Sequence, residues 1–489
     1  MHLPESRKSV KGDRAMGLLL RIAREAVCMF ARFILTFKKP KQCLSDLSIW
    51  DVGVNERNHL VVGGCDCHDL AQEYGTPLHV VNQSRLIADF NDFRNSFKSY
   101  DGGVEVYYSY KTNPVAGVLS LLHEQGAGAE VISSFELWLA LKLGVPPGKI
   151  IYNGPFKSDE SLEVAIDQEI KLIHIDSFDE IDRIRAVAKG LRKVPQVGIR
   201  VCSDVGWSHQ LGLKIASGEA FEAYKKCART ENLKVCALHL HLGTSLRNPH
   251  IYTEAVDTVC AFVKDIRDKL GIEIEYLDVG GGFAVPSVGH LGGYVARFYR
   301  WGGYGPPPPN QGDCPKIETF ARNIVEHIDD GCKKFNLAKP ILLLEPGRAI
   351  TSSAQILLIK VSTIKRDQER VKAVIADGGI NIAYPATGEY HEIFLASRMN
   401  EEREAFYSIS GPLCTPADKL YPHKMMPRIQ RGDILAIMDS GAYFIPFSNN
   451  FSFPRPAVVN AFQGRHRLLR QREGFEDMVS KDKHWRTGG

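Results

Sequence analysis

The chain has 489 residues, of which 44% are hydrophobic, 24% charged and 9% aromatic. This composition excludes intrinsic disorder, and the length allows two or three domains. A net charge of +4, from 61 basic and 57 acidic residues, gives no field that would make nucleic acid the expected partner. The eleven cysteines include no CxxC pair, which predicts reduced thiols in the cytoplasm and no zinc site.

Residues 1–40 are predicted to be an N-terminal extension outside the main fold. Its apolar part, Met16 to Phe37, is interrupted by Arg21, Arg24, Glu25 and Arg32. These charges argue against a transmembrane segment, and no small-residue cleavage site marks a signal peptide. An amphipathic helix that lies on a partner or on a bilayer surface remains an alternative.

From about residue 100, short β-rich runs alternate with helical patterns such as Ser134–Leu143 and Tyr252–Leu270. The predicted strands are Glu105–Tyr110, Ala129–Ile132, Ile150–Asn153, Leu172–Asp176, Gln196–Val201, Val235–Leu242, Ile274–Val279 and Ile341–Leu344. Eight buried strands separated by helices are what a closed parallel barrel requires. The predicted fold class is therefore α/β, with a (β/α)8 TIM barrel over residues 83–349.

The sequence texture changes after residue 350. Period-two stretches, among them Gln355–Val361, Ala373–Ile375 and Ile434–Met438, predict a second, β-rich domain over residues 350–470. The run Pro77–Asn82 is surplus to the eight barrel strands, so residues 41–82 are expected to contribute to that domain. Residues 286–315 are predicted to be an inserted loop after the seventh barrel strand, and residues 471–489 a polar tail.

Chemistry in such a barrel is expected where the strands end, and the first predicted strand ends beside Lys111. A barrel interior that excludes water would disfavour the charged form of this lysine, which makes it a candidate to form an imine. The alternative is an ordinary solvated charge.

His239 and His241 are predicted to share one face at the end of the sixth strand. Two histidines at this spacing can be metal ligands, but no further His, Asp or Glu set completes a site. A buried, hydrogen-bonded pair is the alternative, and no metal is predicted.

Two motifs follow the seventh and eighth strands, Gly280-Gly281-Gly282 and Glu345-Pro346-Gly347-Arg348. Consecutive glycines expose backbone N–H groups that bind anions, and an arginine adds a donor for phosphate. A tight turn would explain the glycines equally well. Together with Lys111, however, the motifs suggest a phosphorylated carbonyl cofactor, pyridoxal 5'-phosphate.

At this point the chain resembles the fold-type III pyridoxal-phosphate decarboxylases, whose barrel is alanine racemase-like and which include diaminopimelate and ornithine decarboxylases. The resemblance covers roughly residues 60–460 and is carried, in order, by the motifs YYSYKTNP, HLHLGTS, DVGGGF, EPGR, GPLC and GAY. The closest branch is that of the diaminopimelate decarboxylases. The resemblance implies a homodimer with shared active sites, because this family takes a cysteine from a second subunit.

The resemblance also implies roles for individual residues. Lys111 would bind the cofactor aldehyde, His241 would stack on the ring, and Glu345 would pair with the ring nitrogen. Cys414, supplied by the partner, would act as the acid. The residues expected around the cofactor phosphate are Thr244, Gly280, Gly281, Gly282, Gly347, Arg348 and Tyr443. The residues expected to contact the substrate are Arg348, Tyr384, Thr415 and Tyr443.

Three positions depart from the family pattern. Thr415 follows Cys414 where relatives have an acid for the far ammonium group, and Tyr384 precedes Pro385 where diaminopimelate enzymes have an arginine. His209 stands where a basic residue and Phe-Gly are usual. Losing an arginine clamp should weaken binding of a tail carboxylate, since a phenol does not replace the guanidinium fork.

These departures favour a modified or conjugated diamino acid, such as one from a siderophore or another secondary-metabolite pathway. The alternatives are decarboxylation of meso-2,6-diaminopimelate to L-lysine, decarboxylation of another basic amino acid, and a non-catalytic regulatory homologue. A racemase is disfavoured, because racemases of this fold place an arginine where Glu345 stands. For Cys414, a small buried hydrophobe is the alternative.

Overall fold

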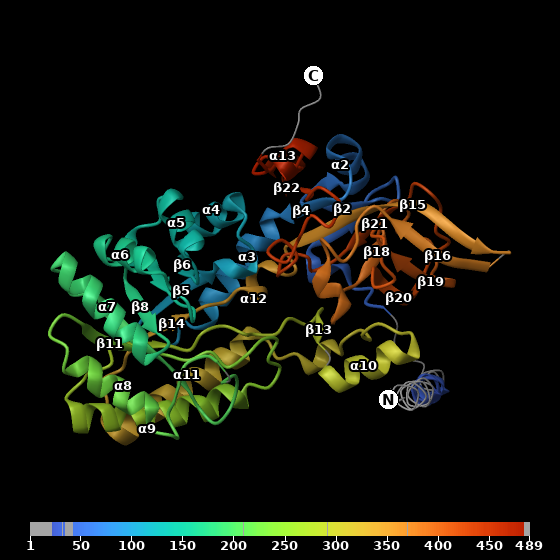
Figure 1. The fold of residues 1–489 in the computed structure, drawn as a ribbon. Helices are drawn as coiled ribbons and strands as arrows, with labels where there is room; N and C mark the ends of the chain where they lie inside the picture. The colour runs from blue at the N-terminus through green and yellow to red at the C-terminus, as the bar shows by residue number, and fades with distance from the viewer. Residues whose placement is uncertain are drawn as a thin grey trace, which may run out of the picture.

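The structure is a computed structural model that describes residues 22–31, 33–34, 43–208, 210–290, 292–368 and 370–483. Its larger domain, on the left of Figure 1, is a closed barrel of parallel strands. In chain order its strands are β5 (Val104–Ser109), β6 (Gly128–Val131), β7 (Ile150–Tyr152), β8 (Leu172–Ile175), β9 (Gln196–Cys202), β11 (Lys234–His239), β12 (Tyr276–Asp278) and β14 (Ile341–Leu344). Pairing of β8 with β9 and of β14 with β5 closes the ring. The predicted barrel is confirmed.

Helices surround the barrel. Each buries apolar side chains against the strands, and polar residues cap the starts of several of them. Ser133 and Ser177 accept backbone N–H bonds at the starts of α5 and α7. The helices of this domain are α3 (Gln83–Ser96), α4 (Ala116–Glu124), α5 (Ser134–Lys142), α6 (Asp159–Asp167), α7 (Phe178–Leu191), α8 (Glu219–Ala228), α9 (His250–Leu270), α11 (Ile317–Phe335) and the short α12 (Arg348–Thr351). One continuous apolar core joins them to the strands.

The second domain, on the right of Figure 1, is built on a mostly antiparallel sheet. Its strands are β4 (Leu78–Asn82), β15 (Gln355–Asp367), β16 (Arg370–Ala376), β18 (Ile393–Leu395), β19 (Ala405–Ser410), β20 (Lys419–Met426), β21 (Ile434–Ile437), β22 (Ala457–Phe462) and β23 (Arg465–Arg470). Strand β4, within the early run Pro77–Asn82, pairs with both β15 and β22 of this sheet. A small sheet of β1 (Val52–Val54), β2 (Leu60–Val62) and β3 (Cys65–Asp66), followed by α2 (Cys67–Tyr74), packs on its core.

The segment after the seventh barrel strand is more ordered than a loop, so that prediction was wrong. It contains β13 (Gly289–His290) and the helix α10 (Gly293–Gly302) before its run of prolines. Strand β13 pairs with β17 (Glu389–Tyr390) of the second domain. The many glycines and prolines suggested a loop, but docking on the second domain gives the segment partners that its sequence does not reveal.

Outside the two domains, residues 22–31 and 33–34 are helical, and the tail carries the short helix α13 (Phe475–Val479). Within the described part of the chain, no helix is both long enough and apolar enough to cross a bilayer. The departure noted at His209 lies outside the described residues. The predicted domain boundaries and the role of the extension stay predictions.

Candidate active site

Lys111 lies directly after β5, in the single turn η2 (Tyr110–Thr112) at the carboxyl end of the barrel. Its Nζ lies 3.0 Å from Oε2 of Glu130 on the neighbouring strand β6. Burial lowers the pKa of Lys111, but the carboxylates of Glu130 and Glu345 raise it by more, so the pKa lies above its ordinary value. The sequence-based expectation of a disfavoured charge was therefore wrong, because a carboxylate faces the amine.

Glu130 is a site residue that the motifs did not reveal. It is fully buried and accepts hydrogen bonds from Lys111, from Oγ of Ser109 at 2.5 Å and from Nδ2 of Asn153 at 3.0 Å. These bonds satisfy the carboxylate and orient the lysine. The available signal was an acid within the otherwise apolar buried run Gly128–Val131.

Glu345 follows β14 and is also buried. Its Oε1 accepts from Nδ2 of Asn153 at 2.5 Å, and its Oε2 lies 3.5 Å from Nε2 of His239. Burial raises the pKa of Glu345, but Lys111, a hydrogen bond with Asp278 and the neighbouring histidines together lower it by more, so the pKa lies below its usual range. A charged carboxylate at this depth can keep a proton on a ring nitrogen placed opposite it.

Beneath Glu345 lies a buried polar cluster with His174, His239 and Asp278. One ligand atom from each of these four residues lies within 4.8 Å of the others, which is compatible with a metal ion. The rings of His174 and His239 stack at 4.6 Å, and burial holds the pKa of each well below its usual value. Burial and the neighbouring Glu345 raise the pKa of Asp278. We read the cluster as support for Glu345; the predicted absence of a metal stays a prediction.

Strand β11 ends at His239, two residues before His241. His241 lies in the following loop, where its Nδ1 accepts the N–H of Gly281 at 3.3 Å. Burial and then Lys111 lower the pKa of His241 to about 3. It is therefore a neutral, flat ring beside Lys111, suited to stack on an aromatic cofactor. The expected pair of histidines on one strand face stays a prediction.

The glycine loop forms a narrow cradle. Gly280 and Gly282 have φ of +69° and +95°, and a Cβ on Gly282 would meet the carbonyl oxygen of Gly243 at 2.3 Å. A Cβ on Gly281 would meet the carbonyl of Glu345 at 2.2 Å. Side chains are thus excluded. The N–H groups of Gly280 and Gly281 bond to Asp278 and His241, so the N–H of Gly282 is the one of the three left to face an anion.

Polar atoms without partners lie around the same loops. Oγ of Ser245, Oγ1 of Thr112 and Nε of Arg348 are buried and make no hydrogen bond. Thr244 precedes Ser245 in the loop after β11, while Gly347 lies so close to Thr112 that a Cβ there would meet its Oγ1 at 2.0 Å. Such atoms fit the phosphate of pyridoxal phosphate, just as Lys111 fits its aldehyde.

Arg348 has a partner that the sequence did not predict. Its fork donates to Glu389 at 3.0 and 2.7 Å, and its guanidinium lies 5.3 Å over the ring of Tyr443. Tyr443 has φ +69°, and its N–H donates to the carbonyl of Thr112 beside Lys111. Tyr443 thus links the second domain to the lysine turn, and its role toward the phosphate stays a prediction. Glu389 follows Gly388, outside every motif that carried the resemblance.

The remaining predicted substrate residues lie in connections between strands of the second domain. Cys414 is exposed, which excludes the small buried hydrophobe as its role within one chain. Thr415 bonds within its own loop. Asp418, the next acid along the chain, is buried and accepts the N–H groups of Ile380 and Leu413, so it does not replace the missing acid. Tyr384 starts the turn η5 (Tyr384–Thr387) and contacts Phe447.

Comparisons with known proteins agree with this geometry. A family model described as "Pyridoxal-dependent decarboxylase, pyridoxal binding domain" matches residues 83–352. The chain is 31% identical over 442 residues to the diaminopimelate decarboxylase of Methanothermobacter thermautotrophicus, covering 88% of this chain and 96% of that protein. It is 30% identical over 434 residues to that of Aquifex aeolicus, covering 86% and 94%.

Solved structures show the same likeness. The crystal structure of diaminopimelate decarboxylase from M. jannaschii in complex with L-lysine superposes with a TM-score of 0.78 at 29% identity, covering 88% of this chain and 97% of that one. The diaminopimelate decarboxylase of Helicobacter pylori, also with L-lysine, gives a TM-score of 0.72 at 23% identity and so supports the fold alone.

Proposed function

Because the chain belongs to the fold-type III pyridoxal-phosphate-dependent decarboxylases, in the diaminopimelate decarboxylase branch, we propose that it removes the α-carboxylate of a diamino acid. The chain is a pyridoxal-phosphate-dependent amino acid decarboxylase. Both relatives are named diaminopimelate decarboxylase, which makes diaminopimelate the first substrate to test. The siderophore-pathway substrate expected from the sequence finds no support in them, so we do not retain it.

The observation that carries this proposal is the convergence of four groups on one end of the barrel. Lys111 supplies an amine, Glu345 a buried carboxylate, His241 a neutral ring and the loop Gly280–Gly282 an anion cradle. Pyridoxal phosphate needs a partner for its aldehyde, its ring nitrogen, its ring face and its phosphate. The four groups provide one partner for each.

The residues of the chain then have distinct tasks. When bound, the cofactor supplies the electron sink for the electron pair left by loss of CO2. Glu345 would hold the ring nitrogen of the cofactor and favour its protonated form, and His241 would stack on the ring and exclude water there. Glu130 orients the amine of Lys111 and stabilises its protonated form.

Release of CO2 from purified protein with pyridoxal phosphate tests the proposal. We expect turnover of diaminopimelate, a visible cofactor band, and loss of both in Lys111→Ala. The matched control is Lys171→Ala, because Lys171 also pairs with a glutamate, Glu105, but at the opposite, amino end of the barrel strands. A protein that takes up no cofactor, or that binds it but releases CO2 from no diamino acid, would refute the proposal.

A second candidate substrate is a diamino acid whose tail has no free carboxylate. Tyr384 stands where an arginine clamp is expected, and Thr415 stands where an acid is expected. Lysine, ornithine and the tail monoamide of diaminopimelate represent this class in the same assay. Their turnover relative to diaminopimelate decides between the two candidates.

We also propose a homodimer in which Cys414 of one subunit serves the other, and a cytoplasmic location. Exposure of Cys414 in the single chain and the eleven free thiols support these two inferences. Mixing inactive Lys111→Ala with inactive Cys414→Ala should restore roughly a quarter of the activity through mixed dimers, as expected for shared sites with random subunit exchange. No recovery despite demonstrated exchange would contradict the shared site.

A further inference from the structure

Arg348 and Glu389 form a buried, two-point ion pair. Their side chains are only 6% and 12% exposed, and both guanidinium nitrogens of the fork are used, at 3.0 and 2.7 Å. Such a fork is the group that would otherwise receive a carboxylate from a ligand. In this chain a resident carboxylate already holds it.

Glu389 is fixed by its surroundings. Strand β17, which carries it, pairs with β13 of the inserted segment, so that Glu389 lies opposite His290. On its other side, Nε2 of His391 lies 3.5 Å from the carboxylate, while Nδ1 of His391 donates to the carbonyl of Met438. The inserted segment therefore helps to fix β17, the strand that carries Glu389.

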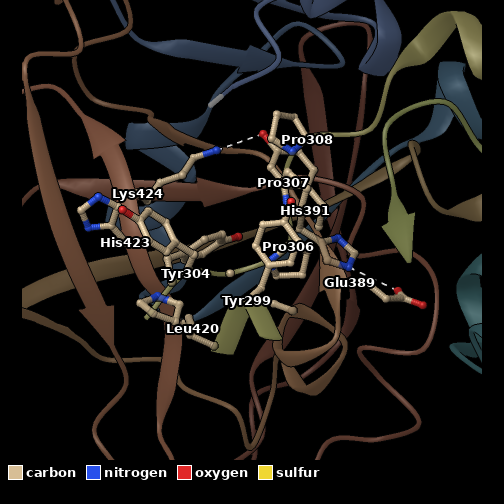
Figure 2. A pocket seen from close by; sticks show the side chains of 15 residues that line it. Tyr299, Tyr304, Pro306, Pro307, Pro308, Glu389, His391, Leu420, His423 and Lys424 are labelled. Carbon is tan, nitrogen blue, oxygen red and sulfur yellow. Dashed lines mark hydrogen bonds and ion pairs between the residues drawn. The ribbon is translucent and has the colours of Figure 1, made fainter. Parts of the chain in front are cut away.

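Figure 2 shows Glu389 and His391 at one edge of a small pocket, with Pro306, Pro307 and Pro308 of the inserted segment lining it. The pocket holds about 50 Å³, room for a few atoms only. Glu389 is held at the edge of this pocket by its two hydrogen bonds to Arg348 and by the pairing of β17 with β13, so a ligand carboxylate would have to displace it from the guanidinium.

The charge of Glu389 makes this displacement costly. Burial raises the pKa of Glu389, but Arg348 and His391 together lower it by more, to about 2, so the carboxylate is ionised at neutral pH. A second carboxylate on the same guanidinium would meet a like charge, and displacement would leave Glu389 buried without its partner. Only Nε of Arg348, buried without a partner, stays available to an acceptor.

Aromatic rings continue from this pair toward solvent. The ring of Tyr443, beneath Arg348, stacks with Phe447 at 6.0 Å, and Phe447 meets Tyr384 at 5.8 Å. Phe447 and Tyr384 are both more than half exposed. Ring faces carry partial negative charge, so they attract cations and apolar groups and not carboxylates.

We propose that Glu389 is a specificity-determining residue, which keeps Arg348 from receiving a tail carboxylate and so favours substrates whose tail is neutral or cationic there. The inference rests on the proposed decarboxylation and refines it. Diaminopimelate stays a substrate, but its tail carboxylate contributes little to its binding. The aromatic series Tyr443, Phe447 and Tyr384 receives the tail instead.

The test compares diaminopimelate with its tail monoamide in the cofactor-loaded wild type and in Glu389→Gln. Two readouts are used, the ratio of kcat/KM and the ratio of dissociation constants from the shift of the visible cofactor band. Wild type should discriminate by less than about tenfold, and Glu389→Gln should shift both ratios toward diaminopimelate by at least about tenfold. Glu401→Gln, which removes an acid paired with Arg398 in the same domain, is the matched control and should leave both ratios unchanged.

A wild-type preference for diaminopimelate above about a hundredfold, or unchanged ratios in Glu389→Gln, would overturn the inference. If Glu389→Gln does not bind the cofactor, Glu389→Ser takes its place, and the same ratios of kcat/KM and of dissociation constants are measured. If no compound releases CO2, the proposed function fails, whereas the band shift still measures what Glu389 does to binding. The two failures are therefore distinguishable.

Discussion

Replacing Glu130 with glutamine should move the pH at which Lys111 captures its cofactor. Nζ of Lys111 lies 3.0 Å from Oε2 of Glu130. At an effective dielectric constant of about 20, two unit charges at that distance interact by about 5 kcal/mol. Because the lysine side chain is 31% exposed, we discount this for solvent screening to about 2 kcal/mol, or about 1.5 pKa units.

The direction of this pH shift follows from the chemistry of imine formation. Only the neutral amine attacks an aldehyde, and a neighbouring carboxylate raises the lysine pKa. Removing that charge lowers the pKa, so the amine is neutral at lower pH. The midpoint of the pH dependence of cofactor uptake should thus fall by about 1.5 units in Glu130→Gln.

Stopped-flow absorbance of apoenzyme mixed with pyridoxal phosphate, from pH 6 to 10, measures this midpoint. Glu105→Gln is the control, because it also removes a carboxylate that pairs with a lysine, Lys171, but at the other end of the barrel. An unchanged midpoint in Glu130→Gln, or one that moves to higher pH, would refute the electrostatic account of Lys111.

Three further predictions test other parts of the site and fold. Glu345→Gln should retain the cofactor band but lose about 10²-fold in kcat, measured by CO2 release, because the ring nitrogen loses its charged partner; an undiminished kcat would contradict this role. Gly282→Ala should lower the free energy of unfolding by about 1–3 kcal/mol, measured by urea denaturation, because its φ is +95° and its Cβ would strike Gly243; wild-type stability would argue against the strained cradle. Burial, with a smaller effect of Arg470, lowers the pKa of His79 to about 3, so the unfolded state binds a proton that the fold rejects, and stability is lost as pH falls from about 6.5 toward 3. His79→Gln should remove about 1.4 kcal/mol per pH unit of this dependence between pH 6 and 4, by urea denaturation at each pH; an unchanged slope would show that His79 is not the group responsible.

The barrel was readable from sequence because its strands are buried on both faces. Such strands give short apolar runs at regular spacing, and all eight predicted runs overlap a barrel strand. The motifs around Lys111, His241, Glu345 and the glycine loop were readable as well, because each combines a reactive or flexible residue with a strand end. These features are local along the chain.

Tertiary structure alone decided the electrostatics and the order of the inserted segment. Glu130 faces Lys111 only because neighbouring barrel strands are parallel and in register. Glu389 meets Arg348 from β17 of the second domain, a strand that pairs with β13 of the inserted segment. Sequence patterns report what one strand or helix buries, whereas the charge on an amine or a guanidinium depends on groups that chain folding brings within about 4 Å from elsewhere.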